Sequence, residues 1–70
     1  MKKLQFNVEK ANIDLATQVL SCRKDILHEP CHKGIMVICP EALTMQVIME
    51  MYGLMDLENI TITLASVFDV

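Results

Sequence analysis

The sequence predicts a small α/β domain, with a three-stranded, mostly parallel sheet and two helices on one face. Segments 3–8 and 60–68 alternate between apolar and polar residues, and segment 35–38 is apolar throughout. Alternation with a period of two is typical of half-buried strands, whereas a short apolar run between turn residues indicates a buried central strand. Because two segments of helical periodicity separate these strands, a parallel β-α-β-α-β arrangement is the simplest connection.

The first half of the chain predicts a strand followed by an amphipathic helix. After the strand at 3–8, Asn12 is a suitable residue to cap the amino end of a helix. Apolar residues then recur at the i, i+4 and i+7 spacing of one helix face. We expect this helix to end near His28, because Pro30 disfavours helical backbone at the residue before it.

The second half predicts the central strand and a second helix. Gly34 precedes the apolar run at 35–38, and Pro40 stands where a helix begins and a missing N–H is tolerated. The helix is expected to cover residues 41–52, with Gly53 as its carboxyl-terminal cap. Its polar stripe is thin, which is typical of a helix buried on more than one side.

The last strand completes a sheet with one uncovered face. Segment 60–68 places Ile60, Ile62, Leu64 and Phe68 on one side. With strand order 1-2-3, two right-handed crossovers put both helices on the same face and leave the other face bare. An α+β fold in which the third strand is antiparallel is the alternative.

Size and composition predict a single domain, residues 1–70, that associates with itself. The chain has 70 residues, of which 53% are hydrophobic and 21% charged, a composition that excludes disorder. A chain this short buries only about 60% of its unfolded surface, so its apolar content exceeds what one core hides. We therefore expect a homodimer, formed by the bare sheet face or by the second helix. The predicted interface residues are Met36, Ile38, Met45, Met49 and Tyr52.

Charge and cysteine content narrow the partners and the compartment. All six Lys and Arg residues lie within positions 1–33, without a concentrated basic face, and aromatic residues make up 4% of the chain. Nucleic-acid binding is therefore not expected. No apolar run approaches the roughly 20 residues of a membrane span, and the amino terminus does not resemble a signal peptide. Three cysteines, an odd number, favour a cytoplasmic protein with reduced thiols.

One candidate ligand site follows from the predicted parallel sheet. Cys39 ends the central strand at the start of the second helix, and Asn12 begins the first helix. In a parallel sheet these two helix amino ends lie side by side, where they favour an anion or a nucleotide phosphate. Glu9 and Lys10 are expected near the same edge. A helix amino end also favours a thiolate, so thiol chemistry at Cys39 is an alternative, although no catalytic base is predicted beside it.

A zinc site is a second alternative. The ligand-type residues Cys22, His28, Cys31 and His32 have the spacing C-x5-H-x2-C-H, which differs from the paired short spacings of common zinc modules. We therefore expect no cofactor.

These observations favour a non-enzymatic binding or regulatory protein that acts as a homodimer, of the kind found among small bacterial or phage inhibitors. Its partner would be a second copy, another protein or a small anionic ligand. The alternatives are an anion or nucleotide binder and a zinc or thiol-redox protein.

Overall fold

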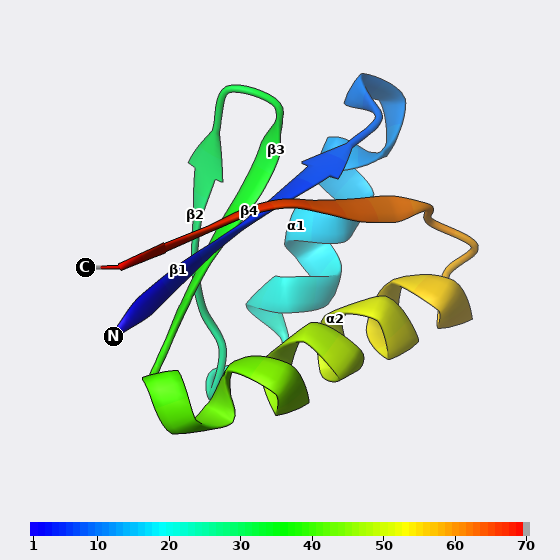
Figure 1. Cartoon of the computed structure of the whole chain (residues 1–70). Coiled ribbons are helices and arrows are strands. Elements are labelled where there is room, and N and C mark those ends of the chain that lie inside the picture. The colour runs from blue at the N-terminus through cyan, green and yellow to red at the C-terminus, as the bar shows by residue number, and fades with distance from the viewer. Residues whose placement is uncertain (70) are drawn as a thin grey trace.

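The chain folds into a four-stranded antiparallel sheet with two helices, an α+β architecture, in the computed structural model shown in Figure 1. The structure describes residues 1–69. The elements in chain order are β1 (Lys2–Val8), α1 (Ile13–Ser21), β2 (Leu27–Cys31), β3 (Gly34–Cys39), α2 (Thr44–Leu57) and β4 (Ile62–Asp69). A short 3-10 turn precedes each helix, at Lys10–Asn12 and at Glu41–Leu43.

The predicted parallel sheet is wrong. The strand order is β2-β3-β1-β4, and every neighbouring pair is antiparallel. The crossover through α1 leads from β1 to β2, and β3 then folds back as a hairpin and lies between them. This β-α-β-β-α-β order is the split βαβ topology of ferredoxin-like folds. The alternative of an α+β fold was closer, although it lacked the strand at β2.

The predicted long first helix is also wrong, because α1 ends at Ser21. The hydroxyl of Thr17 donates to the carbonyl oxygen of Ile13, and the hydroxyl of Ser21 donates to that of Thr17, both at 2.8 Å. Such back-bonding slightly destabilises and often bends a helix. The chain then turns, and Leu27–Cys31 pairs with β3. Pro30 is tolerated there because β2 is an edge strand and needs no further N–H donor.

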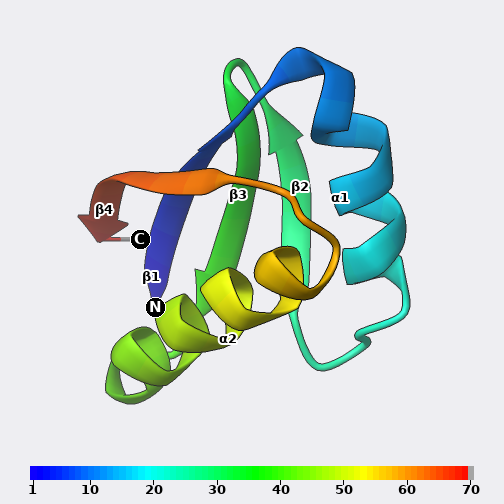
Figure 2. The same ribbon diagram turned by 90° about the vertical axis from the view of Figure 1, so that its right-hand side faces the viewer.

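Both helices cover one face of the sheet, as Figure 2 shows. The fully buried side chains come from β1, β3 and both helices, and the largest are Phe6, Leu4, Leu20, Ile35, Met51, Met55 and Val37. The opposite face has no helix over it. The expected arrangement of two helices on one face therefore holds, although the strand order differs.

The second helix runs past Gly53, the residue predicted to cap it, and ends at Leu57. Asn59 adopts the left-handed conformation, with φ of 57°. The amide of Asn59 donates to Asp56 O at 3.0 Å, and the amide of Ile60 donates to Met55 O at 2.9 Å. These two bonds form a Schellman motif, which satisfies the last carbonyl groups of the helix.

A β-bulge in β4 changes which face its last residues occupy. The register against β1 shifts between Gln5 and Phe6, so that Ser66 pairs with Gln5 and Leu64 pairs with Phe6. The extra residue moves the alternation by one position. Phe68 therefore lies on the uncovered face beside Lys3, rather than sharing a face with Leu64 as the unbroken alternation predicted.

Each edge of the sheet has a feature that disfavours pairing with another strand. On β2, Pro30 has no N–H to offer. On β4, the amide of Leu64 donates to the hydroxyl oxygen of Tyr52 at 2.9 Å, and the bulge twists the strand. The ring of Tyr52 packs edge-on against Phe6, with centroids 6.0 Å apart. Tyr52 therefore joins α2, the core and the β4 edge.

Within residues 1–69, no helix is both long and apolar enough to cross a bilayer.

We expect Gly53→Ala to stabilise the protein by about 0.5–1 kcal/mol, because the helix interior disfavours glycine and a Cβ there meets no atom within 4 Å. Urea unfolding at constant pH measures the change. Gly34→Ala is the contrasting variant, since its Cβ would lie 2.2 Å from Phe6 O. A Gly53→Ala variant no more stable than the wild type would contradict the helical position of this residue.

We expect Tyr52→Phe to cost about 0.5–1.5 kcal/mol, because it removes the acceptor for the Leu64 amide but keeps the ring against Phe6. Hydrogen exchange at the Leu64 amide should accelerate by more than the global loss of stability explains. Unchanged protection at Leu64 would show that the hydroxyl does not hold this edge.

Candidate functional site

The uncovered side of the sheet is the candidate site, and we call it the open face. Because antiparallel partners share a face, the register gives three rows across β2, β3, β1 and β4. The first row is Leu27, Ile38, Lys3 and Phe68; the second is Glu29, Met36, Gln5 and Ser66; the third is Cys31, Gly34, Asn7 and Thr63.

One end of the open face is apolar and accessible to solvent. Leu27 is 58% exposed and Phe68 44% exposed, although both lie in a sheet. Met36 and Ile38 lie between them on β3 and are half-buried. Large apolar side chains grouped on an uncovered sheet face are typical of a surface that another molecule covers.

An ion pair crosses the middle of this apolar end. Lys3 Nζ lies 3.4 Å from Glu29 Oε1, so that the pair reaches from β1 over β3 to β2. Both side chains are partly exposed, and such a pair contributes only about 0–1 kcal/mol to stability. The ion pair matters more for the charge of the surface, because it gives the apolar end one positive and one negative charge side by side.

The other end of the open face is polar. Its third row includes Asn7 and Thr63, and the second row contributes Gln5 and Ser66. Asn7 Oδ1 is shielded from solvent, and none of residues 1–69 hydrogen-bonds to it. The apolar contact surface is therefore confined to the end of the sheet where β1 begins and β4 ends.

The residues predicted for the anion site do not come together. Cys39 pairs with Lys2 at the beginning of β1, whereas Glu9, Lys10 and Asn12 follow the end of β1. Because β3 is antiparallel to β1, its carboxyl end lies at the opposite end of the sheet from them. Cys39 is also buried. The prediction that the amino ends of the two helices lie side by side is therefore wrong, because it required a parallel sheet.

The residues of the alternative zinc site are also spread over the fold. Cys22 follows the end of α1, Cys31 is on the open face, and His32 is in the turn between β2 and β3. His28 lies on the other side of β2, with Nδ1 3.4 Å from Ile26 O. In the described part of the chain, no three His, Cys, Asp or Glu side chains are placed to hold a metal ion.

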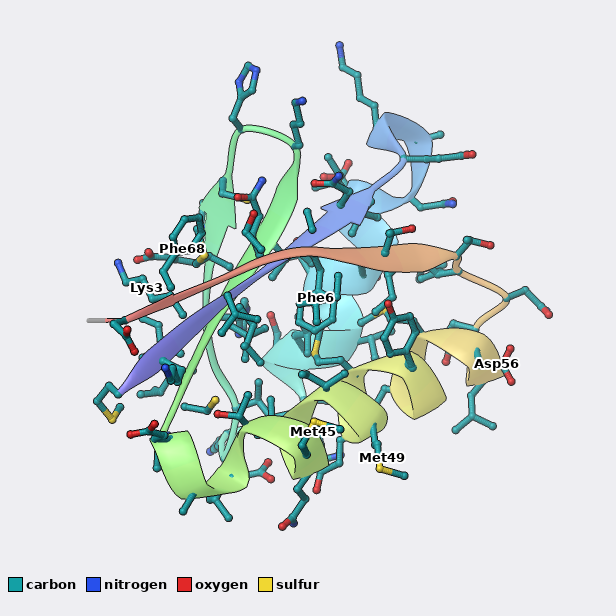
Figure 3. The ribbon with its side chains drawn as sticks, in the orientation of Figure 1. Lys3, Phe6, Met45, Met49, Asp56 and Phe68 are labelled. Atoms are coloured by element: carbon teal, nitrogen blue, oxygen red, sulfur yellow. The ribbon has the colours of Figure 1, made fainter. Side chains whose placement is uncertain are left out.

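The predicted interface residues fall on two separate surfaces. Met36 and Ile38 are on the open face. Met45 and Met49, at 69% and 70% exposure, lie on α2 (Figure 3). Tyr52, which is 40% exposed, lies on the same helix. One interface does not include all five.

A shallow groove of about 400 Å³ lies between the two helices and was not predicted. Its lining is largely apolar and comprises Leu15, Gln18, Val19, Cys22, Arg23, Leu54 and Glu58. Arg23 is held at its edge by Asp25 and by Glu50, with nitrogen–oxygen distances of 2.8 and 3.1 Å. Hydrogen bonding to Asp25 raises the pKa of Arg23 above its ordinary value. This guanidinium is thus already bound within the chain.

Four open-face residues were not predicted as site residues from the sequence: Leu27, Glu29, Lys3 and Phe68. The alternation Leu27, Glu29, Cys31 was available as a signal, but Pro30 within it favours a turn over a strand. For Phe68 no signal was available, because the bulge that turns it outward depends on pairing with β1.

A second ion pair joins the two strands that carry Lys3 and Phe68. Lys2 Nζ donates to Asp69 Oδ1, and Glu41 lies 3.9 Å from the same nitrogen. The hydrogen bond from Lys2 lowers the pKa of Asp69, and that same bond is the main cause of the raised pKa of Lys2. The pair links the first and last strands at the apolar end.

Comparison of the chain with known protein families, with curated proteins and with solved structures found no match.

We expect the Lys2–Asp69 pair to make stability depend on pH at both extremes. Because the pKa of Asp69 is lowered, its contribution is present above the ordinary aspartate pKa of about 3.9 and disappears as pH falls through the folded value. Because the pKa of Lys2 is raised, its contribution is complete below about 10.4 and disappears as pH rises through the folded value.

Urea unfolding of the wild type and of Asp69→Asn across this range tests the pair. The variant should lose less stability than the wild type on acidification, while Glu58→Gln serves as an exposed carboxylate control. If the free energy of unfolding fell equally with pH in the wild type and in Asp69→Asn, the Lys2–Asp69 pair would not be the source of the acid dependence.

Proposed function

We propose that the protein is a small non-enzymatic binding and regulatory module that acts as a homodimer, with the two copies packed through their open faces. The observation that carries this proposal is the exposed apolar end of that face, formed by Leu27, Met36, Ile38 and Phe68. Burial of such side chains contributes roughly 25 cal/mol per Å² of apolar surface removed from water. A second copy supplies an apolar surface of the same size and shape.

The protection of the sheet edges favours face packing over edge pairing. Pro30 removes a donor from the β2 edge, and the Tyr52 hydroxyl occupies the Leu64 amide on the β4 edge. Two copies joined as one continuous sheet would need those backbone groups. Face-to-face packing needs none of them, and stacked sheets pack about 10 Å apart through side chains alone.

The charge on the open face is compatible with a symmetric dimer. Two copies related by a two-fold axis present the same surface to each other, so a face of one charge sign would repel itself. Lys3 and Glu29 are adjacent and of opposite sign. Each pair can stay intact or exchange partners across the interface, and in either case no charge is left without a counter-ion.

The charged groups at the apolar end of the open face suit a contact surface. The charged groups of the apolar end, Lys3 and Glu29, are paired with each other. The free thiols Cys22, Cys31 and Cys39 are in keeping with a reducing compartment, and we propose the cytoplasm.

The test is the mass of the protein in solution, measured by sedimentation equilibrium over a range of concentrations. The wild type should be a dimer, and Phe68→Ala should raise its dissociation constant by about tenfold or more, as for a large aromatic side chain buried in an interface. Ile38→Lys should give a monomer, because it places a charge inside the interface.

Met49→Lys is the matched control, since it introduces the same charge on the exposed side of α2. Circular dichroism and urea unfolding establish that each variant is folded. A wild type that stays monomeric up to high micromolar concentration would refute the proposal. Equal weakening by Ile38→Lys and Met49→Lys would also refute an open-face interface.

A further inference from the structure

A second apolar surface lies on α2, on the side that adjoins β4, and we call it the methionine flank. It consists of Met45, Met49, Tyr52 and Val67, which are 69%, 70%, 40% and 47% exposed. The three helix residues follow the i, i+4, i+7 spacing of one helical stripe. Figure 3 shows Met49 directed away from the sheet.

We assign Val67 to the flank because it pairs with Leu4 on the helix-covered side of the sheet and because β4 runs beside α2. The Tyr52 hydroxyl bonds to the Leu64 amide, which aligns the helix and the strand at one point. The two elements run in opposite directions (Figure 1). From that point Val67 lies three strand residues away, roughly 10 Å, and Met45 lies seven helix residues away in the same direction, also roughly 10 Å.

Acidic residues stand at both ends of the methionine flank. Glu41 precedes Met45 by four residues, and Asp56 follows Tyr52 by four. Both carboxylates are exposed. Lys2 approaches Glu41 at 3.9 Å but bonds to Asp69, and no salt bridge among residues 1–69 reaches Asp56. The chain has no lysine or arginine after Lys33.

This charge pattern decides between the occupants of the flank. If the α2 helices of two copies packed antiparallel, Glu41 of each copy would face Asp56 of the other. If they packed parallel, Glu41 would face Glu41 and Asp56 would face Asp56. Like charges brought together at an interface are unfavourable, so a second copy does not fit. The same sign disfavours an anionic lipid surface and a nucleic acid.

We propose that the methionine flank binds a cationic amphipathic helix of another protein. Its apolar stripe would pack on Met45, Met49, Tyr52 and Val67, and lysine or arginine near its two ends would meet Glu41 and Asp56. Helices commonly bind in this way through anchors at i, i+4 and i+7. Methionine side chains adapt to different apolar partners, which suits a surface of this kind. This role goes beyond the open-face dimer and does not depend on it.

The test uses protein labelled with ¹³C at the methionine methyl groups and a synthetic helical peptide of about 18 residues. The peptide carries leucine at i, i+4, i+7 and i+11 and lysine on its other faces, and a second peptide of equal composition distributes the leucines around the helix. Five of the six methionines report on separate places: Met45 and Met49 on the flank, Met36 on the open face, and Met51 and Met55 in the core.

The amphipathic peptide should shift the methyl signals of Met45 and Met49 but not those of Met51 and Met55. Its affinity should fall several-fold in Glu41→Gln/Asp56→Asn, and should fall as salt rises from about 50 to about 500 mM. Glu9→Gln/Asp14→Asn is the matched control, because it changes the net charge equally at exposed residues away from the flank. Met45→Gln/Met49→Gln should abolish binding while circular dichroism stays unchanged.

Three results would overturn the proposal: equal binding of the two peptides, equal affinity of the two charge variants, or a peptide-induced shift at Met36 without one at Met45 and Met49. The open-face dimer is read independently, from the change of the Met36 signal on dilution without peptide. Failure of one proposal is therefore distinguishable from failure of the other.

Discussion

The rest of the structure depends on the close contact between Gly34 and the backbone of β1. A side chain at this position would place its Cβ 2.2 Å from Phe6 O and 2.8 Å from Val8 N. Only glycine lets β3 enter the sheet directly against β1, with the Val8 amide bonded to Lys33 O just before it. Once β3 occupies that place, its hairpin partner β2 is carried to the edge, and β1 becomes a central strand paired on both sides.

The molecule has one covered and one uncovered sheet face. The crossovers through α1 and α2 both pass over the side that buries Leu4, Phe6 and Val8. Two short helices are enough to cover one face of four strands, and the chain has no third helix for the other within residues 1–69. The apolar surplus of the sequence therefore appears on the open face and on the outer side of α2, not in a larger core.

The two apolar surfaces differ in charge, and this difference separates their proposed roles. On the open face, Lys3 and Glu29 balance each other, so the surface is compatible with its own copy. On the methionine flank, Glu41 and Asp56 have the same sign, so the surface is suited to an oppositely charged partner. A dimer formed through the open faces leaves both methionine flanks on the outside, and the two modes of association can therefore coexist.

Local patterns of the sequence determined β1, most of α2 and the existence of surplus apolar surface. Leu4, Phe6 and Val8 alternate with polar residues, and β3 is an apolar run. Each pattern reflects which side chains are buried, so each strand can be predicted from its own segment. The sequence also predicts more apolar side chains than one core can bury. The predicted interface residues Met36, Ile38, Met45 and Met49 all retain solvent exposure in the fold.

Tertiary structure alone decided the strand order, the edge strand β2 and the outward turn of Phe68. Leu27–Cys31 has no strong strand signal and is extended because β3 supplies its hydrogen bonds. The bulge in β4 likewise exists only through its pairing with β1. These long-range pairings also separated Cys39 from Asn12, since an antiparallel neighbour reverses which strand ends meet, and no pattern within one segment carries that information.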